Sequence, residues 1–127
     1  MNDNPSAVSL RFYGISPWEM EVLHGLFNNK FKIIQEETTQ IDTNFVSELI
    51  IVIPVQFSEE FFKWFEFRTW EKVQSILKEM KRRRGKGNAI KIEIVFTGKP
   101  NVRFITDLSE SHLFNSSIEK IDFVVEL

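Results

Sequence analysis

Alternation of apolar and polar side chains predicts several β-strands that bury one face. The pattern is clearest in residues 90–97, where isoleucine and phenylalanine at even positions alternate with mostly polar neighbours. Residues 98–101, Gly-Lys-Pro-Asn, have the composition of a turn, so this strand and the next one are expected to form a hairpin. The same reasoning predicts strands at residues 7–13, 31–35, 90–97, 102–106 and 118–127.

One further strand is predicted from a continuous apolar run rather than from alternation. The centre of residues 45–55 reads Leu-Ile-Ile-Val-Ile and offers apolar side chains to both faces. A strand of this kind belongs in the middle of a sheet, where something covers each side. Pro54 has no amide hydrogen, so we expect the hydrogen-bond ladder to fail there on one side.

Two regions have the period of a helix. Residues 16–19, Ser-Pro-Trp-Glu, combine an N-cap serine, a proline at the first helical position and a glutamate that completes a capping box. The second region, residues 58–84, would be about 40 Å long as one straight helix. A compact domain of this size is only about 36 Å across. We therefore expect a short helix at residues 59–67 and a main helix at 70–84, with Thr69 as its N-cap.

The predicted order is strand, helix, strand, strand, helix, strand and then two more strands. The first six elements, residues 7–97, resemble the βαββαβ plan of the ferredoxin-like sandwich. This resemblance implies an α+β fold with helices on one face of a mainly antiparallel sheet, extended here by two C-terminal strands. With 127 residues, the chain is expected to form a single domain, 1–127, with a disordered N-terminus at residues 1–6.

Composition limits the classes of partner and compartment. The net charge of −2 provides no global field for nucleic acid, so any such binding has to come from a local patch. The chain has no cysteine, which excludes disulfides, thiolate metal sites and cysteine nucleophiles. Its longest apolar run is too short to span a bilayer and no signal peptide is recognisable, so we expect a cytoplasmic protein without a membrane partner.

No motif of a known catalytic or cofactor site is present. The sequence lacks a glycine-rich phosphate loop, a nucleophile elbow and a histidine–carboxylate metal motif. His24 and His112 stand at unrelated places in the chain. We therefore assign no catalytic residue, no metal and no cofactor, and favour a protein that is not an enzyme. A small-molecule enzyme or sensor remains as a second alternative, because the groups of a site need not be neighbours in sequence.

Aromatic residues are concentrated in residues 57–70, and one helix face cannot bury them all. With the phenylalanines at 62 and 65 turned inward, other rings point to other sides. Either a second element covers these rings, or they form an exposed patch for a partner. Our leading hypothesis is a protein–protein interaction or assembly module that either forms a homo-oligomer or binds a protein partner as a subunit of a larger assembly. The predicted interaction patch consists of Phe61, Trp64, Phe67 and Trp70.

The run Lys-Arg-Arg-Arg-Gly-Lys at residues 81–86 gives a different alternative, binding of RNA or DNA. Arginine binds phosphate oxygens through two parallel hydrogen bonds. Cations at the end of a helix also complement its macrodipole without any ligand. The aliphatic central strand lacks the aromatic motif of sheet-based RNA readers, which counts against recognition on the sheet. The candidate phosphate contacts are Arg82, Arg83, Arg84 and Lys86.

Overall fold

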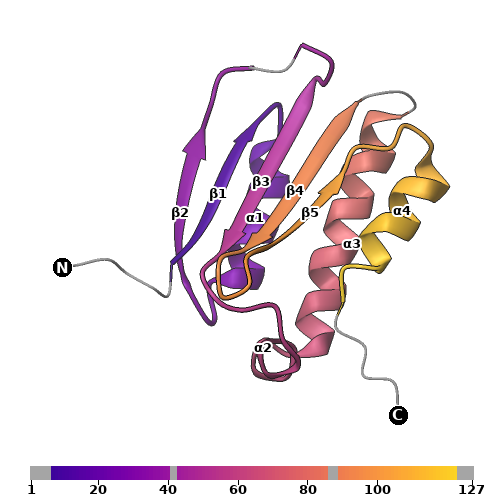
Figure 1. Ribbon diagram of the computed structural model, residues 1–127. Helices are drawn as coiled ribbons and strands as arrows, with labels where there is room; N and C mark the ends of the chain where they lie inside the picture. The colour runs from indigo at the N-terminus through magenta and orange to yellow at the C-terminus, as the bar shows by residue number, and fades with distance from the viewer. Residues whose placement is uncertain (1–6, 41–42, 86–88, 123–127) are drawn as a thin grey trace.

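The computed structural model describes residues 7–40, 43–85 and 89–122, which form five strands and four helices (Figure 1). The strands are β1 (Ala7–Tyr13), β2 (Lys32–Glu37), β3 (Ser47–Ile53), β4 (Ile90–Phe96) and β5 (Val102–Thr106). The helices are α1 (Pro17–Phe27), α2 (Glu59–Phe65), α3 (Phe67–Arg84) and α4 (Ser111–Glu119). The fold is α+β, and the first five predicted strands are present, within one or two residues of their expected bounds.

The strands form one mixed sheet in the order β2-β1-β3-β4-β5. β1 is parallel to β2 and β3 is parallel to β4, whereas the β1–β3 and β4–β5 pairs are antiparallel. Parallel neighbours need a crossover connection, which α1 supplies for the first pair and α2 with α3 for the second. β3 is the middle strand of the sheet, as its apolar character on both faces predicts.

The ferredoxin-like topology is not confirmed by this strand order. In a split βαβ unit, another strand lies between the two strands that a helix joins. Here both pairs of helix-joined strands are direct neighbours, and two of the four pairings are parallel. The sheet is therefore mixed rather than mainly antiparallel. Element order alone does not distinguish these arrangements, because each contains the same succession of strands and helices.

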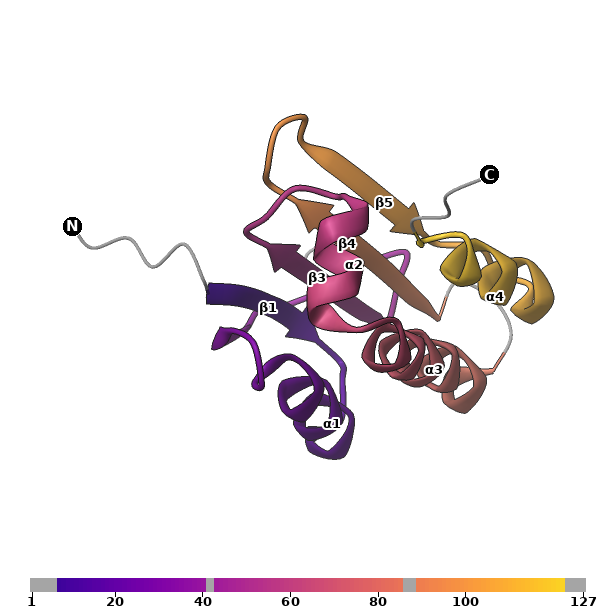
Figure 2. The same ribbon diagram turned by 90° about the horizontal axis from the view of Figure 1, so that it is seen from below.

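The helices gather on one face of the sheet, as predicted. α1 and α3 lie against this face, α4 packs beside α3, and α2 lies near one end of the strands (Figures 1 and 2). β3 shows the consequence for single residues, because Leu49, Ile51 and Ile53 are fully buried while the side chains between them are only half-buried. The main core thus lies between the sheet and the helices.

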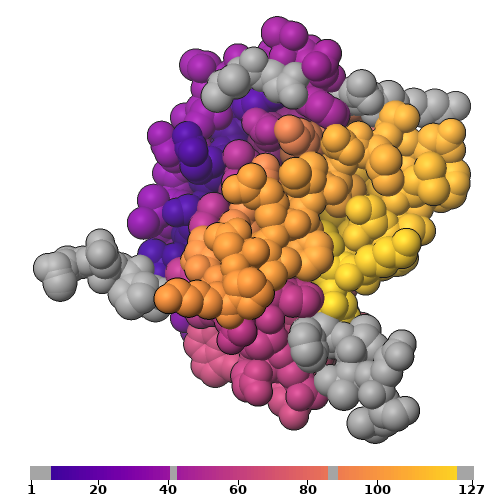
Figure 3. Space-filling view, viewed as in Figure 1, coloured from indigo at the N-terminus to yellow at the C-terminus, as the bar shows by residue number. Residues whose placement is uncertain are grey.

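None of the four described helices lies over the opposite face of the sheet, which the space-filling view of Figure 3 shows. Cross-strand ion pairs form on the neighbouring strands of this face. They join Arg11 to Glu36 at 3.2 Å, Lys91 to Glu48 at 3.9 Å and Arg103 to Glu93 at 2.9 Å. These charges keep the open face polar although isoleucine and valine lie between them.

The structure confirms the predicted start of α1, whereas the main helix begins three residues earlier than predicted, at Phe67. At α1, the Ser16 side chain accepts a hydrogen bond from the Glu19 amide and the Glu19 carboxylate accepts one from the Ser16 amide, so the capping box is confirmed. The second helical region does break in two, but the break is at Glu66, and Thr69 lies inside α3 instead of capping it. None of the helices in the described ranges is long and apolar enough to cross a membrane.

The C-terminal strand predicted at residues 118–127 is wrong for its first residues. These belong to the end of α4, in which Phe114 and Ile118 lie one helical turn apart and are both buried. The (i, i+4) spacing of this pair is a helical period that the polar surroundings obscure. Residues 123–127 of the predicted strand, like the expected disorder at residues 1–6, lie outside the described residues.

Candidate functional site

The helical region turns sharply at Glu66, and residues 63–68 around this turn are named the α2–α3 elbow below. Glu66 has φ = 81°, a value that residues other than glycine rarely adopt. Its amide donates to the Phe62 carbonyl at 2.9 Å and closes α2, while its carbonyl accepts from the Trp70 amide at 3.1 Å and opens α3. The two helices therefore leave the elbow in different directions without losing the hydrogen bonds of the turn.

Two of the four residues in the predicted interaction patch are not on the surface. Phe61 is 4% exposed and Trp70 is 1% exposed, so the prediction that they contact a partner from the surface is wrong. The ring of Phe61 lies 5.3 Å from that of Phe96, and the indole nitrogen of Trp70 donates to the Ile121 carbonyl at 2.6 Å. Burial of these rings against the sheet and against the end of α4 explains the difference.

Trp64 and Phe67 are the two large rings that the elbow exposes. Their exposed fractions are 47% and 42%. The Trp64 ring meets the ring of Phe31 edge-on at 5.3 Å, and the Lys30 ammonium lies 5.4 Å from the Trp64 ring centroid. Phe67 stacks on Phe62 at 6.0 Å. Each ring is therefore half covered and supported by its own neighbours, which fixes its orientation at the surface.

A hollow of about 240 Å³ lies directly beside Trp64. Phe61 and Val55 contribute apolar walls, and Ser58, Gln56 and Glu60 contribute polar ones. The elbow thus presents a projecting ring and an adjoining recess. Such a pair of features fits contact with another protein, because buried aromatic anchors in pockets contribute most to binding energy at interfaces.

Of the four cations that the sequence suggested for phosphate binding, the three in the described residues contact other groups of the chain. Arg84 is the clearest case, since all five of its N–H donors have partners. Two of them bind the Glu19 carboxylate oxygens, each at 2.9 Å. The others bind the Ser47 hydroxyl and the carbonyls of Gly14 and Met80 at 2.8–2.9 Å. Arg84 thus ties the end of α3 to the start of α1 and has no donor left for a phosphate.

The neighbouring cations of the described residues differ from Arg84 in their burial and in the groups that they contact. Arg82 forms an ion pair with Glu79, and Arg83 lies 5.1 Å from the ring centroid of the exposed Trp18. Lys81 is fully buried, with its ammonium 5.8 Å from the ring centroid of Phe114, and burial lowers its pKa. Lys86 lies outside the described residues. The basic run therefore does not present all its charges on one surface.

The Glu19 side chain is 1% exposed, and its surroundings strongly favour the charged form. Burial by itself would raise the pKa of Glu19. Hydrogen bonds from Arg84 and from the Ser16 amide and hydroxyl outweigh this effect and lower the pKa to about 2. Glu19 is consequently ionised at neutral pH, and it bridges the helix cap and Arg84.

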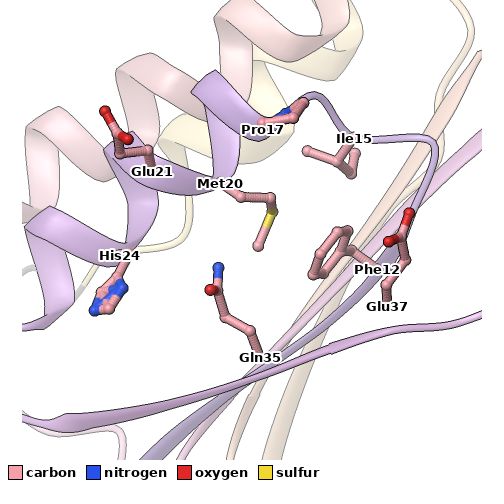
Figure 4. Close-up of a pocket in the computed structure, with 8 residues that line it drawn as sticks. All are labelled: Phe12, Ile15, Pro17, Met20, Glu21, His24, Gln35 and Glu37. Carbon is pink, nitrogen blue, oxygen red and sulfur yellow. The ribbon is translucent and has the colours of Figure 1, made fainter.

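A cavity of about 480 Å³ lies between α1 and β2 (Figure 4). Phe12, Ile15, Pro17 and Met20 form its apolar part. Figure 4 shows the thioether of Met20 and the side chain of Phe12 turned toward the interior.

Four polar side chains complete this cavity. Glu21 and His24 come from α1, and Gln35 and Glu37 come from β2. The amide of Gln35 points into the cavity toward Met20, Glu37 stands beside Phe12, and the carboxylate of Glu21 turns outward at the rim (Figure 4). Gln35 and Glu37 point to the helix side of β2 because they alternate with Glu36, which pairs with Arg11 on the open face.

Sequence reasoning did not identify the Glu19–Arg84 ion pair or the α1–β2 cavity. Glu19 was predicted only as a member of the capping box, and no role was assigned to His24. On the side of β2 that faces the helix, Ile33 is followed by the polar residues Gln35 and Glu37, and these two are the sequence signal for the cavity. It becomes visible only when β2 is known to be an edge strand beneath α1.

Comparisons of the chain with protein-family models, with curated proteins and with solved structures find no significant match.

Proposed function

We propose that this chain is a protein–protein interaction module that associates with a second copy of itself through the α2–α3 elbow. The observation that carries the proposal is the exposure of Trp64 and Phe67, at 47% and 42%, on a rigidly supported turn. Tryptophan is among the residues enriched at binding hot spots, and a preorganised ring loses little conformational entropy on binding. Both properties favour contact with a protein.

The charges of the elbow favour a second copy as the partner. The cations around the two rings are Lys63, Arg68 and Lys30, whose ammonium lies 5.4 Å from the Trp64 ring centroid. The carboxylates are Glu60, Glu66 and Glu59, which pairs with Lys63 at 3.8 Å. Three positive and three negative groups leave the surface without a net charge. In an interface with two-fold symmetry the same patch meets itself, and a balanced patch does so without repulsion. The recess beside Trp64 further allows the ring of each copy to enter the hollow of the other.

Nucleic-acid binding, the alternative that the sequence raised, has less support. All five N–H donors of Arg84 are hydrogen-bonded to acceptors within the chain, and Arg82 forms an ion pair with Glu79. Phosphate contact by these residues would have to break existing ion pairs. An affinity for RNA or DNA that falls steeply with salt would nevertheless restore this alternative.

The test measures the molar mass of the full chain by size-exclusion chromatography with light scattering. We expect the wild type to have the mass of two chains and the double variant Trp64→Glu/Phe67→Glu to have the mass of one. A matched control is Trp18→Glu/Leu113→Glu, which introduces the same charges at exposed apolar residues of α1 and α4, and it should keep the mass of two chains. A monomeric wild type would overturn the proposal, as would a control variant that dissociates as fully as the elbow variant.

A further inference from the structure

We propose that the outer edge of β2 and the adjoining α1–β2 cavity together bind an extended peptide segment of another protein, which adds a strand to the sheet beside β2. In this mode of recognition, main-chain hydrogen bonds hold the peptide and a side-chain pocket selects its sequence. None of the residues that line the cavity belongs to the elbow, so this partner is distinct from the second copy that the elbow binds.

The backbone of β2 directs hydrogen-bonding groups away from β1. Among the described strands, β2 stands at the edge of the sheet and pairs with β1 alone. The Thr38 amide donates to the Phe12 carbonyl at 2.7 Å, so the even-numbered residues at this end of β2 face β1. Backbone groups of successive residues in a strand point to opposite sides. Ile33, Gln35 and Glu37 consequently direct their N–H and C=O groups to the outer edge.

The centre of this edge strand is not protected against pairing. Edge strands are commonly blunted by proline or by charged side chains. Residues 33–35 read Ile-Ile-Gln and carry neither, because the charged residues of β2 stand at its two ends. Ile34 is 56% exposed on the open face of the sheet. A strand added beside β2 would place a cross-strand neighbour next to this side chain and bury part of it.

The cavity supplies a side-chain pocket at the same edge. Gln35 and Glu37 line it, and their backbone groups are the ones that point outward. A side chain directly opposite either residue on an added strand would have its Cβ about 5 Å away, on the same face of the sheet. That face carries α1, and there Phe12 and the buried residues Ile15 and Met20 form an apolar floor (Figure 4).

The volume of about 480 Å³ leaves room for a large apolar side chain. An extended peptide fills the cavity and pairs with the edge at once. A small molecule in the cavity would leave the outward backbone groups of β2 without a protein partner. The two features together therefore favour a peptide.

Uncharged peptides test the proposal without any contribution from the carboxylates or the histidine that line the cavity. The parent probe is acetyl-Thr-Val-Thr-Leu-Thr-Val-Thr-amide, in which apolar and polar side chains alternate as in a strand. Methionine, phenylalanine or glycine replaces the central leucine in the other probes. We expect NMR signals of the Met20 methyl and the Gln35 amide to shift saturably, and the methyl of the buried Met80 to stay unchanged. The glycine probe should bind at least about tenfold more weakly than the best apolar probe.

Removal of hydrogen bonds separates strand pairing from simple filling of the cavity. N-methylation of the central amides of the parent probe removes donors from both edges of the peptide and should abolish the shifts. Gln35→Pro removes an N–H from the outer edge but no bond to β1, because this amide points away from β1. It should weaken binding at least about fivefold relative to Gln35→Ala, which keeps the amide.

Several results would overturn the proposal. They are the absence of a Gln35 shift with every probe, equal binding of the leucine and glycine probes, and equal binding of the parent and the N-methylated probe. A Gln35→Pro variant with half the molar mass of the wild type would show that β2 pairs with a second copy, and this would also overturn it. If Gln35→Pro proves unfolded by circular dichroism, the N-methylated probe decides.

Discussion

At the scale of single residues, Glu19 links local and distant parts of the structure. It closes the capping box at the start of α1, and its carboxylate oxygens also receive the guanidinium of Arg84, 65 positions later in the chain. A buried ion pair contributes little net stability compared with an apolar pair of equal shape, but removing one partner leaves the other charge unsatisfied. Loss of Glu19 or Arg84 alone is therefore expected to destabilise the fold, because the remaining charge loses its partner.

Glu19→Gln is expected to lower the free energy of unfolding by up to about 3 kcal/mol at neutral pH, because it leaves the guanidinium of Arg84, whose side chain is only 14% exposed, without its counter-charge. The folded pKa of Glu19, about 2, lies below its ordinary value of 4.5. The stabilisation is thus fully present above pH 4.5 and is lost as the pH falls toward 2. Urea denaturation should show that the difference in free energy of unfolding between wild type and variant becomes smaller as the pH is lowered from 5 to 3.

Glu21→Gln is the control for this prediction. Glu21 lies on the same helix, but it is exposed and outside the ion pair, so the change should alter stability by less than about 0.5 kcal/mol. A gap between wild type and Glu19→Gln that stays constant down to pH 3 would show that the ionised carboxylate is not what Arg84 requires.

At the scale of elements, α4 depends on hydrogen bonds from side chains of α3. The Gln74 amide nitrogen lies 3.1 Å from the Ile118 carbonyl and 3.3 Å from the Ile121 carbonyl, and the Trp70 indole nitrogen donates to the latter. The last carbonyls of a helix have no partner within the helix. Long-range side chains supply donors here, which explains how a short, polar helix is held against the domain.

Gln74→Leu should destabilise the chain by about 0.5–1.5 kcal/mol, because the buried Ile118 carbonyl loses the Gln74 donor and keeps only the Ile121 amide. Amide hydrogen exchange in α4 should accelerate more than exchange in β3. Gln56→Leu is the matched control, because Gln56 also donates to a distant carbonyl, that of Lys99, but at an exposed position. Equal destabilisation by both variants, or unchanged exchange in α4, would contradict this account of how α4 is held.

At the scale of the whole molecule, the sequence predicts the elements far better than their arrangement. Local signals such as the capping box at Ser16, the alternation in β4 and the length limit on the second helical region depend on neighbouring residues, and they were confirmed. Strand order and the Glu19–Arg84 ion pair join distant parts of the chain, so no local pattern reveals them. The predicted interaction patch placed both Trp64 and Trp70 at the surface. Trp64 is exposed and Trp70 is buried, because elements distant in the chain cover only the second ring.

Self-association through the elbow should make thermal stability depend on protein concentration. Folding coupled to assembly is favoured by mass action, so a tenfold rise in chain concentration should raise Tm by about 2–4 °C for a chain of this size. Trp64→Glu/Phe67→Glu should abolish this dependence while leaving the Tm at low concentration nearly unchanged, because both rings are half exposed in the single chain. Scanning calorimetry over a range of concentrations measures both effects. A double variant that unfolds much earlier at every concentration would instead mean that the two rings stabilise the single chain, and a wild-type Tm independent of concentration would exclude assembly coupled to folding.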